Sequence, residues 1–530
     1  MTERYSAGHR RGVVCAPHSA AAEAGREILA EGGNALEAML AMAGTIAAVY
    51  PHMNHLGGDG FWLIREPNGR VRAIMAAGPA GRNAQPELYR EFDAIPTRGP
   101  LAALTVPGAV GGWMLALEAA QACGGKLPLE LLLAPAITHA RNGYTVTRSQ
   151  KRLTEEHLDN LAGVHGFAAT FLIDGKVPAV GASLKQEKLA DTLAQLAHTG
   201  LDDFYRGDVG REIALDLERL GSPVTREDIS RYRAALAEPL RTRLRSGTIY
   251  NTDAPTQGVV SLMILALFDR LDVSTAESFD HIHLLVEATK RALSMRDRAV
   301  TDPNRLSHPL ERYLEERFLA GEAMKIDRRK AAPWRPRTAD SDTIWMGAAD
   351  ASGLVVSYIQ SIYWEFGSGL VLPRTGVLMQ NRGASFSLVA GALNRLAPGR
   401  LPFHTLNPAL AVLNDGRVMA YGCMGGDGQP QTQAAVFTRH VMFREPLEEA
   451  IDRPRWVLGR TWGASRTSLR LEPRFSDELF ETLAATGHDV EVLTEPYSDV
   501  MGHAGAVVLH PDGALEGAHD PRADGGAAGL

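Results

Sequence analysis

The amino-acid sequence predicts an α+β fold in which helices dominate the first two thirds of the chain and strands dominate the last third. Residues 110–330 alternate helical runs with loops. After Thr343 the apolar runs become short and are separated by turn sequences such as Asn414-Asp415-Gly416 and Pro511-Asp512-Gly513, a pattern typical of strands. The chain has 530 residues and is 45% hydrophobic, which is enough for a large core or two lobes.

The first long element predicted is a helix that begins after Asn34. Asn34 can cap the helix, and Glu37 stands three residues later, as a capping box requires. Apolar side chains then recur at helical spacing, at Leu36, Met39, Leu40, Ala43, Ile46 and Ala47. Pro51 ends this helix, and the glycine-rich segment 57–60 leads into a predicted strand over 61–64.

Two further helices are predicted in the middle of the chain. The apolar run 258–268 is too short to span a bilayer and predicts a buried helix. The segment 281–293 predicts an amphipathic helix with one apolar face, formed by Ile282, Leu285, Val286, Thr289 and Leu293.

A β-hairpin is predicted directly after Asp342. The runs 344–349 and 354–361 are apolar, and the Asp-Ala-Ser-Gly turn of 350–353 joins them. The first strand is expected to begin at Thr343. Further strands are predicted over 409–413, 418–421 and 505–509.

The Asp342-Thr343 junction is a candidate site for self-cleavage of the chain. A hydroxyl that directly follows a strained peptide bond can attack the preceding carbonyl, and water can then release a new chain end. Thr343 would thereby gain an α-amine with a pKa of about 7.7–8.0, close enough to its own hydroxyl to act as a base. The alternative is that Thr343 simply starts a strand.

Several sequence blocks decide between these alternatives by their order and spacing. They are 30–63 (AEGGNALEAMLAMAGTIAAVYPHMNHLGGDGFWL), 104–113 (LTVPGAVGGW), 281–293 (HIHLLVEATKRAL), 366–388 (FGSGLVLPRTGVLMQNRGASFSL), 399–410 (GRLPFHTLNPAL), 422–431 (GCMGGDGQPQ) and 502–508 (GHAGAVV). Together they resemble the γ-glutamyltransferase family of N-terminal-nucleophile (Ntn) hydrolases, proenzymes that are cut before a threonine.

This resemblance implies a fold and a set of site residues. The fold is the Ntn-hydrolase four-layer αββα sandwich, formed jointly by a large subunit (1–342) and a small subunit (343–530). Cleavage is expected between Asp342 and Thr343, with Thr343 as the catalytic nucleophile. The backbone N–H groups of Gly425 and Gly426 are expected to bind the developing oxyanion, because glycine lets the backbone approach a substrate closely.

The expected substrate contacts depart from those of the γ-glutamyl enzymes. The family's carboxylate-binding arginine is missing from the loop 75–84, and Arg82 is the candidate to replace it. The family's Ser-Ser pair is replaced by His404-Thr405. Ser385 stands where an aspartate would bind the substrate ammonium, and Arg382 lies close by. The alternative for Arg382 is a structural ion pair.

These exchanges keep groups that bind an anion and remove the partner of an amino group. Burying an unpaired ammonium costs several kcal/mol. We therefore expect a small amide that bears a carboxylate and no α-amine. In this respect the chain resembles the oxamate amidohydrolase and acylase branch of the family more than its glutathione enzymes.

Other features favour structural roles. His52 and His55 lack a third ligand at a convincing spacing, so a hydrogen-bonded loop is expected there in place of a metal site. No metal and no cofactor are predicted. Cys15, Cys123 and Cys423 are expected to be reduced, buried thiols.

Charge and terminal sequence restrict partners and location. The net charge of −7 argues against nucleic acid and anionic membranes as partners. The first residues lack the apolar segment of a secretory signal, which favours a cytoplasmic location.

Three functions remain open from the sequence. The first is a self-processing threonine amide hydrolase whose two fragments stay associated, with a small-molecule amide as substrate and a higher oligomer possible. The second is a γ-glutamyltransferase with atypical substrate contacts. The third is an inactive ligand-binding homologue. The choice between water and an amine as acceptor also stays open.

Overall fold

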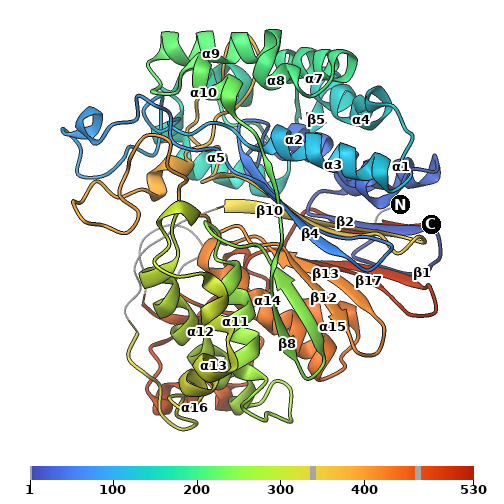
Figure 1. Ribbon diagram of the computed structural model, residues 1–530, viewed down its shortest axis with the longest axis vertical. Coiled ribbons are helices and arrows are strands. Elements are labelled where there is room, and N and C mark those ends of the chain that lie inside the picture. Colours follow the sequence, from blue (N-terminus) through green and yellow to red (C-terminus); the bar gives the residue numbers. More distant parts are fainter. Residues whose placement is uncertain (1–2, 335–341, 460–466) are drawn as a thin grey trace.

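The protein is built in four layers, with two β-sheets packed face to face and helices on both outer sides (Figure 1). The computed structural model describes residues 3–334, 342–459 and 467–530. The two described ends of the chain lie side by side at one edge of the sheets. This arrangement confirms the predicted Ntn-hydrolase αββα sandwich.

The first large sheet carries the predicted hairpin at its centre. Its seven strands, all paired antiparallel, run in the order β19 (Gly526–Gly529), β2 (Gly12–Ala16), β10 (Asp342–Asp350), β11 (Val355–Tyr363), β3 (Asp59–Arg65), β4 (Val71–Ala76) and β7 (Ala235–Ala237). β10 begins one residue earlier than the sequence predicts.

The second large sheet is also antiparallel and has seven strands. They run in the order β1 (Tyr5–His9), β18 (Leu515–His519), β17 (Ala504–Leu509), β13 (Val418–Cys423), β12 (Ala409–Leu413), β9 (Gly247–Asn251) and β8 (Leu240–Leu244). Each sheet thus combines strands from both sides of residue 343, so neither part of the chain completes a sheet alone.

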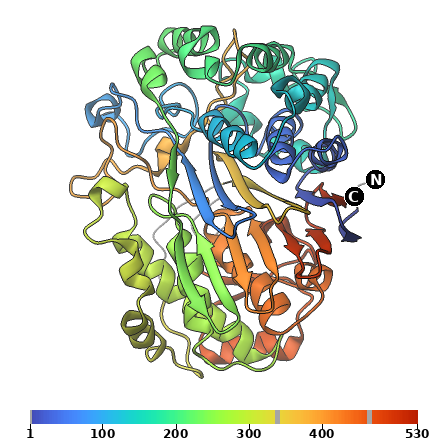
Figure 2. The same ribbon diagram turned by 45° about the vertical axis from the view of Figure 1, so that its right-hand side comes forward.

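Helices from the first half of the chain cover the first sheet (Figure 2). They are α1 (Ser19–Ala30), α2 (Ala35–Val49), α3 (Ala109–Ala122), α4 (Leu129–Asn142), α5 (Arg148–Leu161), α6 (Phe167–Phe171), α7 (Glu187–Thr199), α8 (Asp203–Arg206), α9 (Asp208–Leu220) and α10 (Arg226–Arg231). The short strands β5 (Tyr144–Thr145) and β6 (Ser183–Leu184) pair among them.

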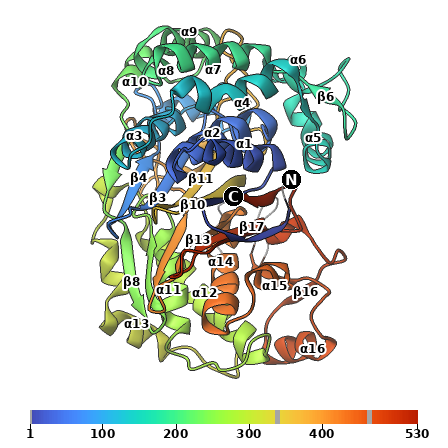
Figure 3. The same cartoon turned by 90° about the vertical axis from the view of Figure 1, so that its right-hand side faces the viewer.

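Helices from both halves of the chain cover the second sheet (Figure 3). They are α11 (Gly258–Phe268), α12 (Phe279–Ala299), α13 (Glu316–Ala323), α14 (Gln429–Phe437), α15 (Leu447–Asp452) and α16 (Asp477–Thr486). A small sheet of β14 (Trp456–Leu458), β15 (Leu469–Leu471) and β16 (Val490–Val492) lies beside them.

Trp345 locks β10 between the two large sheets. Its side chain is buried in the inter-sheet core, and its indole N–H donates to Ser357 Oγ at 2.9 Å. A Cβ atom at Gly422 would lie 2.0 Å from the indole, and one at Gly505 would lie 2.5 Å from it. Glycine is therefore required at both positions, and Trp345 holds the strand two residues after Thr343.

Most predicted elements are confirmed, with one clear exception. Helix α2 has the predicted capping box at Asn34 and Glu37, and α11 matches the buried run 258–268. The segment 110–330 was expected to alternate helices and loops, yet besides the short pair β5 and β6 it contributes β7, β8 and β9 to the two large sheets. These strands are short and half-exposed, so their apolar pattern is weak, and pairing with distant strands stabilises them.

The three cysteines differ in how deeply they are buried. Cys15 and Cys423 are buried, but Cys123 is only partly buried, contrary to expectation, because it follows α3 at the surface of the helical layer.

In the described part of the chain, no helix has the length and apolarity needed to cross a membrane.

Candidate active site

Thr343 lies at an irregularity in the first sheet. Its side chain is completely buried. Asp342 pairs with Tyr363 and Ile344 pairs with Gln360, so β11 has two residues opposite the single residue Thr343. Such a bulge bends a strand and redirects its side chains. Gln429 Nε2, at the start of α14, donates to Thr343 Oγ1 at 3.4 Å.

Tyr363 is strained at this bulge. Its φ angle is +85°, in a region that bulky residues rarely adopt. Such strain costs about 1–3 kcal/mol and is concentrated at functional sites. Tyr363 pairs with Asp342, whose carbonyl Thr343 is predicted to attack. No signal in the sequence marked this residue, because an aromatic residue in an apolar run predicts an ordinary strand.

Gly425 and Gly426 form a tight loop between β13 and α14. Their φ angles are +118° and +50°, so both positions favour glycine. Gly428 N–H donates to Gly425 O at 2.7 Å and closes a 3-10 turn over Gly426–Gly428. The loop stands at the N-terminus of α14, where backbone N–H groups lack helical acceptors.

Gln257 ties this loop to the His404-Thr405 segment. Its Nε2 donates to Gly426 O at 2.8 Å and to Thr405 O at 2.7 Å. Its Oε1 accepts from Arg296 Nη1 at 2.9 Å, and Arg296 also pairs with Asp427. The glycine loop is therefore held from the side of α12.

A chain of hydrogen bonds brings three of the predicted segments together. Gln429 bonds Thr343, and its Oε1 accepts from Asn407 Nδ2 at 3.2 Å. Asn407 Nδ2 also donates to Thr405 O at 2.9 Å. Thr343, Thr405 and the Gly425-Gly426 loop therefore belong to one buried network. Gln429 and Asn407 were not identified from the sequence, because only the fold brings them together.

Arg382 is buried without a hydrogen-bond partner. It is 1% exposed, in a 3-10 turn over Arg382–Ser385. Its guanidinium carbon lies 3.9 Å from the ring centroid of Tyr363. None of its three guanidinium nitrogens has a hydrogen-bond partner in the described parts of the chain. Burial lowers the pKa of Arg382 to about 10, so it remains a cation at neutral pH. A buried cation of this kind is suited to an anionic ligand.

Asp59 and His404 face each other in the same region. Asp59 Oδ1 accepts from Gly78 N at 3.1 Å and from Gly108 N at 3.0 Å, and Asp59 Oδ2 lies 3.4 Å from His404 Nε2. Burial raises the pKa of Asp59 to about 7, although the charge of Arg382 lowers it. Burial, and then Arg382, hold the pKa of His404 well below its usual value.

The pairing of β3, β11 and β10 gives the separation between the backbones of Asp59 and Thr343. Asp59 pairs with Ser361 on β11, and the bulge of β11 lies opposite Thr343 on β10. Since neighbouring strands are about 4.8 Å apart, the two backbones are separated by roughly 10 Å. Asp59 was not identified from the sequence, where it stands among the glycines of a strand entry.

Ser385 and Arg82 are placed differently from Arg382. Ser385 Oγ donates to Phe403 O at 3.1 Å, next to His404, so it borders the site with its proton already engaged. Arg82 is half-exposed and pairs with Glu227 of α10, and its backbone N–H donates to Asp228. The two acids of α10 thus hold Arg82 outside the buried group.

The histidines that resembled a metal pair are hydrogen-bonded, as predicted. His55 Nδ1 accepts from Leu378 N at 3.0 Å, and His52 Nε2 lies 3.2 Å from Ser149 Oγ.

A second set of candidate metal ligands lies on the far side of the second sheet. Atoms of His283, Glu287 and His488 come within 4.8 Å of one another. Lys290 Nζ already donates to Glu287 at 2.7 Å, and the two imidazoles bond each other at 2.8 Å. These contacts satisfy the groups without an ion.

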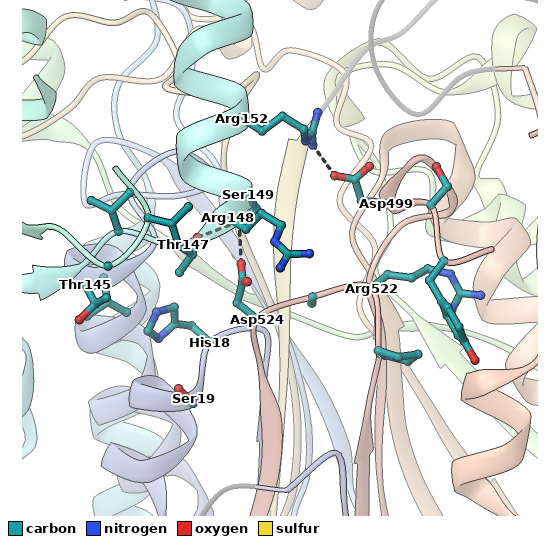
Figure 4. Close-up of a pocket in the computed structure, with 18 of the residues that line it drawn as sticks. His18, Ser19, Thr145, Thr147, Arg148, Ser149, Arg152, Asp499, Arg522 and Asp524 are labelled. Atoms are coloured by element: carbon teal, nitrogen blue, oxygen red, sulfur yellow. Dashed lines mark hydrogen bonds and ion pairs between the residues drawn. The ribbon is translucent and has the colours of Figure 1, made fainter. Parts of the chain in front are cut away.

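A large cavity opens at the same end of the first sheet as Thr343. It has a volume of about 1270 Å³ and is lined from both halves of the chain. Figure 4 shows Arg152 paired with Asp499, and Ser149 donating to Asp524 at 2.6 Å. β2 runs antiparallel to β10, so His18, just after β2, lies towards the Thr343 end. The described lining contains none of the predicted site residues.

Comparison with known proteins places this architecture in a family. The family model described as Gamma-glutamyltranspeptidase matches residues 21–530. The chain is 52% identical over 520 residues to the "Oxamate amidohydrolase proenzyme" of Klebsiella pneumoniae subsp. pneumoniae, with 98% of each chain covered. It is 28% identical over 538 residues to the "Glutathione hydrolase proenzyme" of Escherichia coli, with 97% of this chain and 90% of that protein covered.

A solved structure agrees in fold over the whole length. The cephalosporin acylase from Bacillus halodurans superposes with a TM-score of 0.90 at 30% identity, and the match covers 100% of this chain and 97% of that chain. We conclude that the chain is an enzyme of the gamma-glutamyltranspeptidase family, with the Ntn-hydrolase fold of that family.

Proposed function

We propose that the chain is a self-processing threonine amide hydrolase that acts on a small amide bearing a carboxylate. The observation that carries this proposal is the buried guanidinium of Arg382, which has no hydrogen-bond partner among the described residues and lies against Tyr363 at the bulge opposite Thr343. A carboxylate beside the reacting amide would supply the missing partner. The 52% identity to a protein named for oxamate hydrolysis supports the same choice.

Self-processing would proceed by attack of Thr343 Oγ1 on the carbonyl carbon of Asp342. The Asp342-Thr343 amide becomes an ester, and the amide nitrogen becomes the α-amine of Thr343. Water then hydrolyses the ester to give a new carboxylate on Asp342. The strain at Tyr363, which pairs with Asp342, supports a reactive peptide bond here.

The processed enzyme would use the same hydroxyl on its substrate. The α-amine of Thr343 accepts the hydroxyl proton while Oγ1 attacks the substrate amide carbon. The N–H groups of Gly425 and Gly426 receive the developing oxyanion, and the amine leaves with a proton. Water then releases the acyl group from Thr343. The fragments 1–342 and 343–530 stay together in this proposal, because each large sheet contains strands from both.

One observation favours the second candidate, a γ-glutamyltransferase. Asp59 places a carboxyl group near Arg382, and a substrate ammonium could pair with it in place of the aspartate missing at Ser385. The 28% identity to a glutathione hydrolase is compatible with this candidate, although it is far below the 52% identity to the oxamate relative. A substrate comparison separates the two.

Specificity is the test of the proposed function. The processed enzyme should have a kcat/KM for oxamate, succinamate or a glutaryl amide at least about 100-fold above that for glutathione or γ-glutamyl-p-nitroanilide. An ammonium without a partner costs several kcal/mol, and about 2.7 kcal/mol already corresponds to 100-fold. Initial rates over this panel measure the ratio. Glutathione as the best substrate would reject the proposal and favour the transferase.

Arg382 provides a second test. Arg382→Ala should raise KM for the preferred acid amide by about 100-fold, because truncating one side of a buried charge pair costs 2–5 kcal/mol. Some loss of stability is expected as well, because Arg382→Ala leaves a cavity beside Tyr363, so the change in KM decides the test. Arg82→Ala is the matched comparison and should keep the wild-type KM, because Arg82 pairs with Glu227 at the surface. A large stability loss in Arg382→Ala with unchanged KM would restore its structural role.

A further inference from the structure

Three buried side chains that influence one another's charge carry polar atoms that the protein itself leaves unsatisfied. Arg382 has three guanidinium nitrogens without a hydrogen-bond partner, His404 has two ring nitrogens without one, and Asp59 Oδ2 also has none, counted over the described residues. All three side chains are at most 1% exposed. Leaving buried polar groups unpaired costs about 1–3 kcal/mol each, so this set is suited to a polar ligand.

The charges of this set are balanced before a ligand enters. Arg382 is a cation, Asp59 can carry the matching negative charge, and burial keeps His404 neutral. A monoanionic substrate that pairs with Arg382 would leave one negative charge in excess. An uncompensated charge in a buried site is costly, so the excess has to be removed.

Other titratable groups near Asp59 cannot remove that charge. Tyr358 of β11, Tyr205 of α8 and Tyr232 act on Asp59 or its surroundings, and burial raises the pKa of each hydroxyl. They therefore stay protonated and neutral in both states. Asp59 and His404, which face each other at 3.4 Å, can accept a proton. The α-amine that processing would give Thr343 is a further acceptor, and the Asp59→Asn variant separates it from this pair.

We propose that Asp59, together with His404, takes up one proton from solvent when a monoanionic substrate binds Arg382, and that this uptake selects acids without an α-amine. The inference rests on the proposed function in one respect, because it takes Arg382 as the group that binds the substrate carboxylate. The proton resides on the Asp59–His404 pair and returns to solvent when the anion leaves. Asp59 is thus a specificity residue.

The preference for acids without an α-amine follows from the net charge that each class of substrate brings into the site. A substrate that carries both a carboxylate and an ammonium adds no net charge, so it would bind without a proton and would need Asp59 ionised. A plain acid amide needs the protonated pair. The two substrate classes therefore favour opposite states of Asp59, and pH shifts the preference between them.

The direction of the pH effect can be worked out from the empty site. The pKa of Asp59 is about 7 before binding, and a bound anion raises it further. Below pH 7 the proton is already present, so affinity for the anion is flat. Above pH 7 each bound anion must bring a proton, so affinity falls about tenfold per pH unit until the pKa of the occupied site is reached.

Calorimetry with pyruvate tests the proposal on the wild-type protein. Pyruvate is a monoanion that has a methyl group where oxamate has its amide nitrogen. Titration of the processed enzyme at pH 8, in buffers of different ionisation enthalpy, should show uptake of most of one proton per pyruvate, and at pH 6 a clearly smaller uptake. Pyruvate that binds at pH 8 without proton uptake, or that does not bind, overturns the proposal.

The variant Asp59→Asn tests whether Asp59 is the group that takes up the proton. Its amide oxygen can still accept from Gly78 and Gly108, so the loops remain supported. We expect no proton uptake and, at pH 8, pyruvate affinity about tenfold or more above wild type. The control Asp216→Asn removes a buried acid that pairs with Arg374, and it should keep the wild-type uptake. Persistent uptake in Asp59→Asn would assign the proton elsewhere and overturn the role of Asp59.

Failure of this inference is distinguishable from failure of the proposed function. The calorimetric measurement needs binding only and no hydrolysis. Proton-linked pyruvate binding by a protein that hydrolyses no acid amide would keep the inference and reject the function. Hydrolysis of oxamate combined with pyruvate binding that takes up no proton would reject the inference and keep the proposed function.

Discussion

Replacing Thr343 by alanine is expected to leave the protein as one chain of 57.2 kDa and to abolish amide hydrolysis. The wild-type protein should give fragments of 342 and 188 residues that co-elute, and the smaller should begin Thr-Ile-Trp-Met-Gly. The reason is that one hydroxyl serves both steps, first on the Asp342 carbonyl and then on the substrate. Denaturing electrophoresis, size-exclusion chromatography and terminal sequencing measure the outcome.

Two further variants serve as controls for this experiment. Thr343→Val keeps the size of the buried side chain and lacks the hydroxyl, so it should also stay uncut. Thr343→Ser keeps a hydroxyl and should still be processed. If Thr343→Ala and Thr343→Val are cut as the wild type is, attack by Thr343 is excluded and the cut belongs to another agent.

Replacing Gly426 by valine is expected to lower kcat by about 100- to 1000-fold, the usual consequence of losing one oxyanion donor. Gly426 has a φ angle of +50°, and a β-branched residue there is strained by roughly 1–2 kcal/mol. The loop can relieve that strain by turning its N–H groups away from the substrate. Turnover should be expressed per processed site, so that any loss of processing is separated from a loss of catalysis.

The control for this variant is Gly32→Val. Gly32 also has a positive φ, of +88°, and an added Cβ there meets no atom within 4 Å. Both variants place a β-branched residue at a positive φ, but Gly32→Val should keep its turnover. Near-wild-type kinetics in Gly426→Val would place the oxyanion donors on other groups.

Local sequence features were sufficient for the regular elements near the site. Asn34 and Glu37 mark the start of α2 because a capping box depends only on neighbouring residues. The hairpin of β10 and β11 was predictable because two apolar runs flank a short turn. The order and spacing of the sequence blocks also indicated the family, which the comparisons then showed.

Residues that act through partners distant in sequence were not predictable in the same way. Tyr363 is strained because a bulge forms opposite Thr343, and a bulge depends on the pairing of two strands. Gln429 and Asn407 matter because α14 and the segment after Thr405 meet at Thr343. Arg82 was predicted to bind the substrate carboxylate. In the structure its side chain pairs with Glu227 of α10, and its backbone N–H donates to Asp228.

By itself, the sequence determined the α+β class and the family, because these depend on local patterns and on motifs that can be recognised along the chain. It also supplied Thr343 and the glycine pair as the predicted catalytic groups. Only the tertiary structure decided which charged groups share a buried site. Asp59 stands more than 300 residues before Arg382 and His404 in the sequence, yet β3, a 3-10 turn and the loop before β12 bring the three residues together. Their protonation depends on desolvation and on each other's charge, and both arise only when the chain is packed.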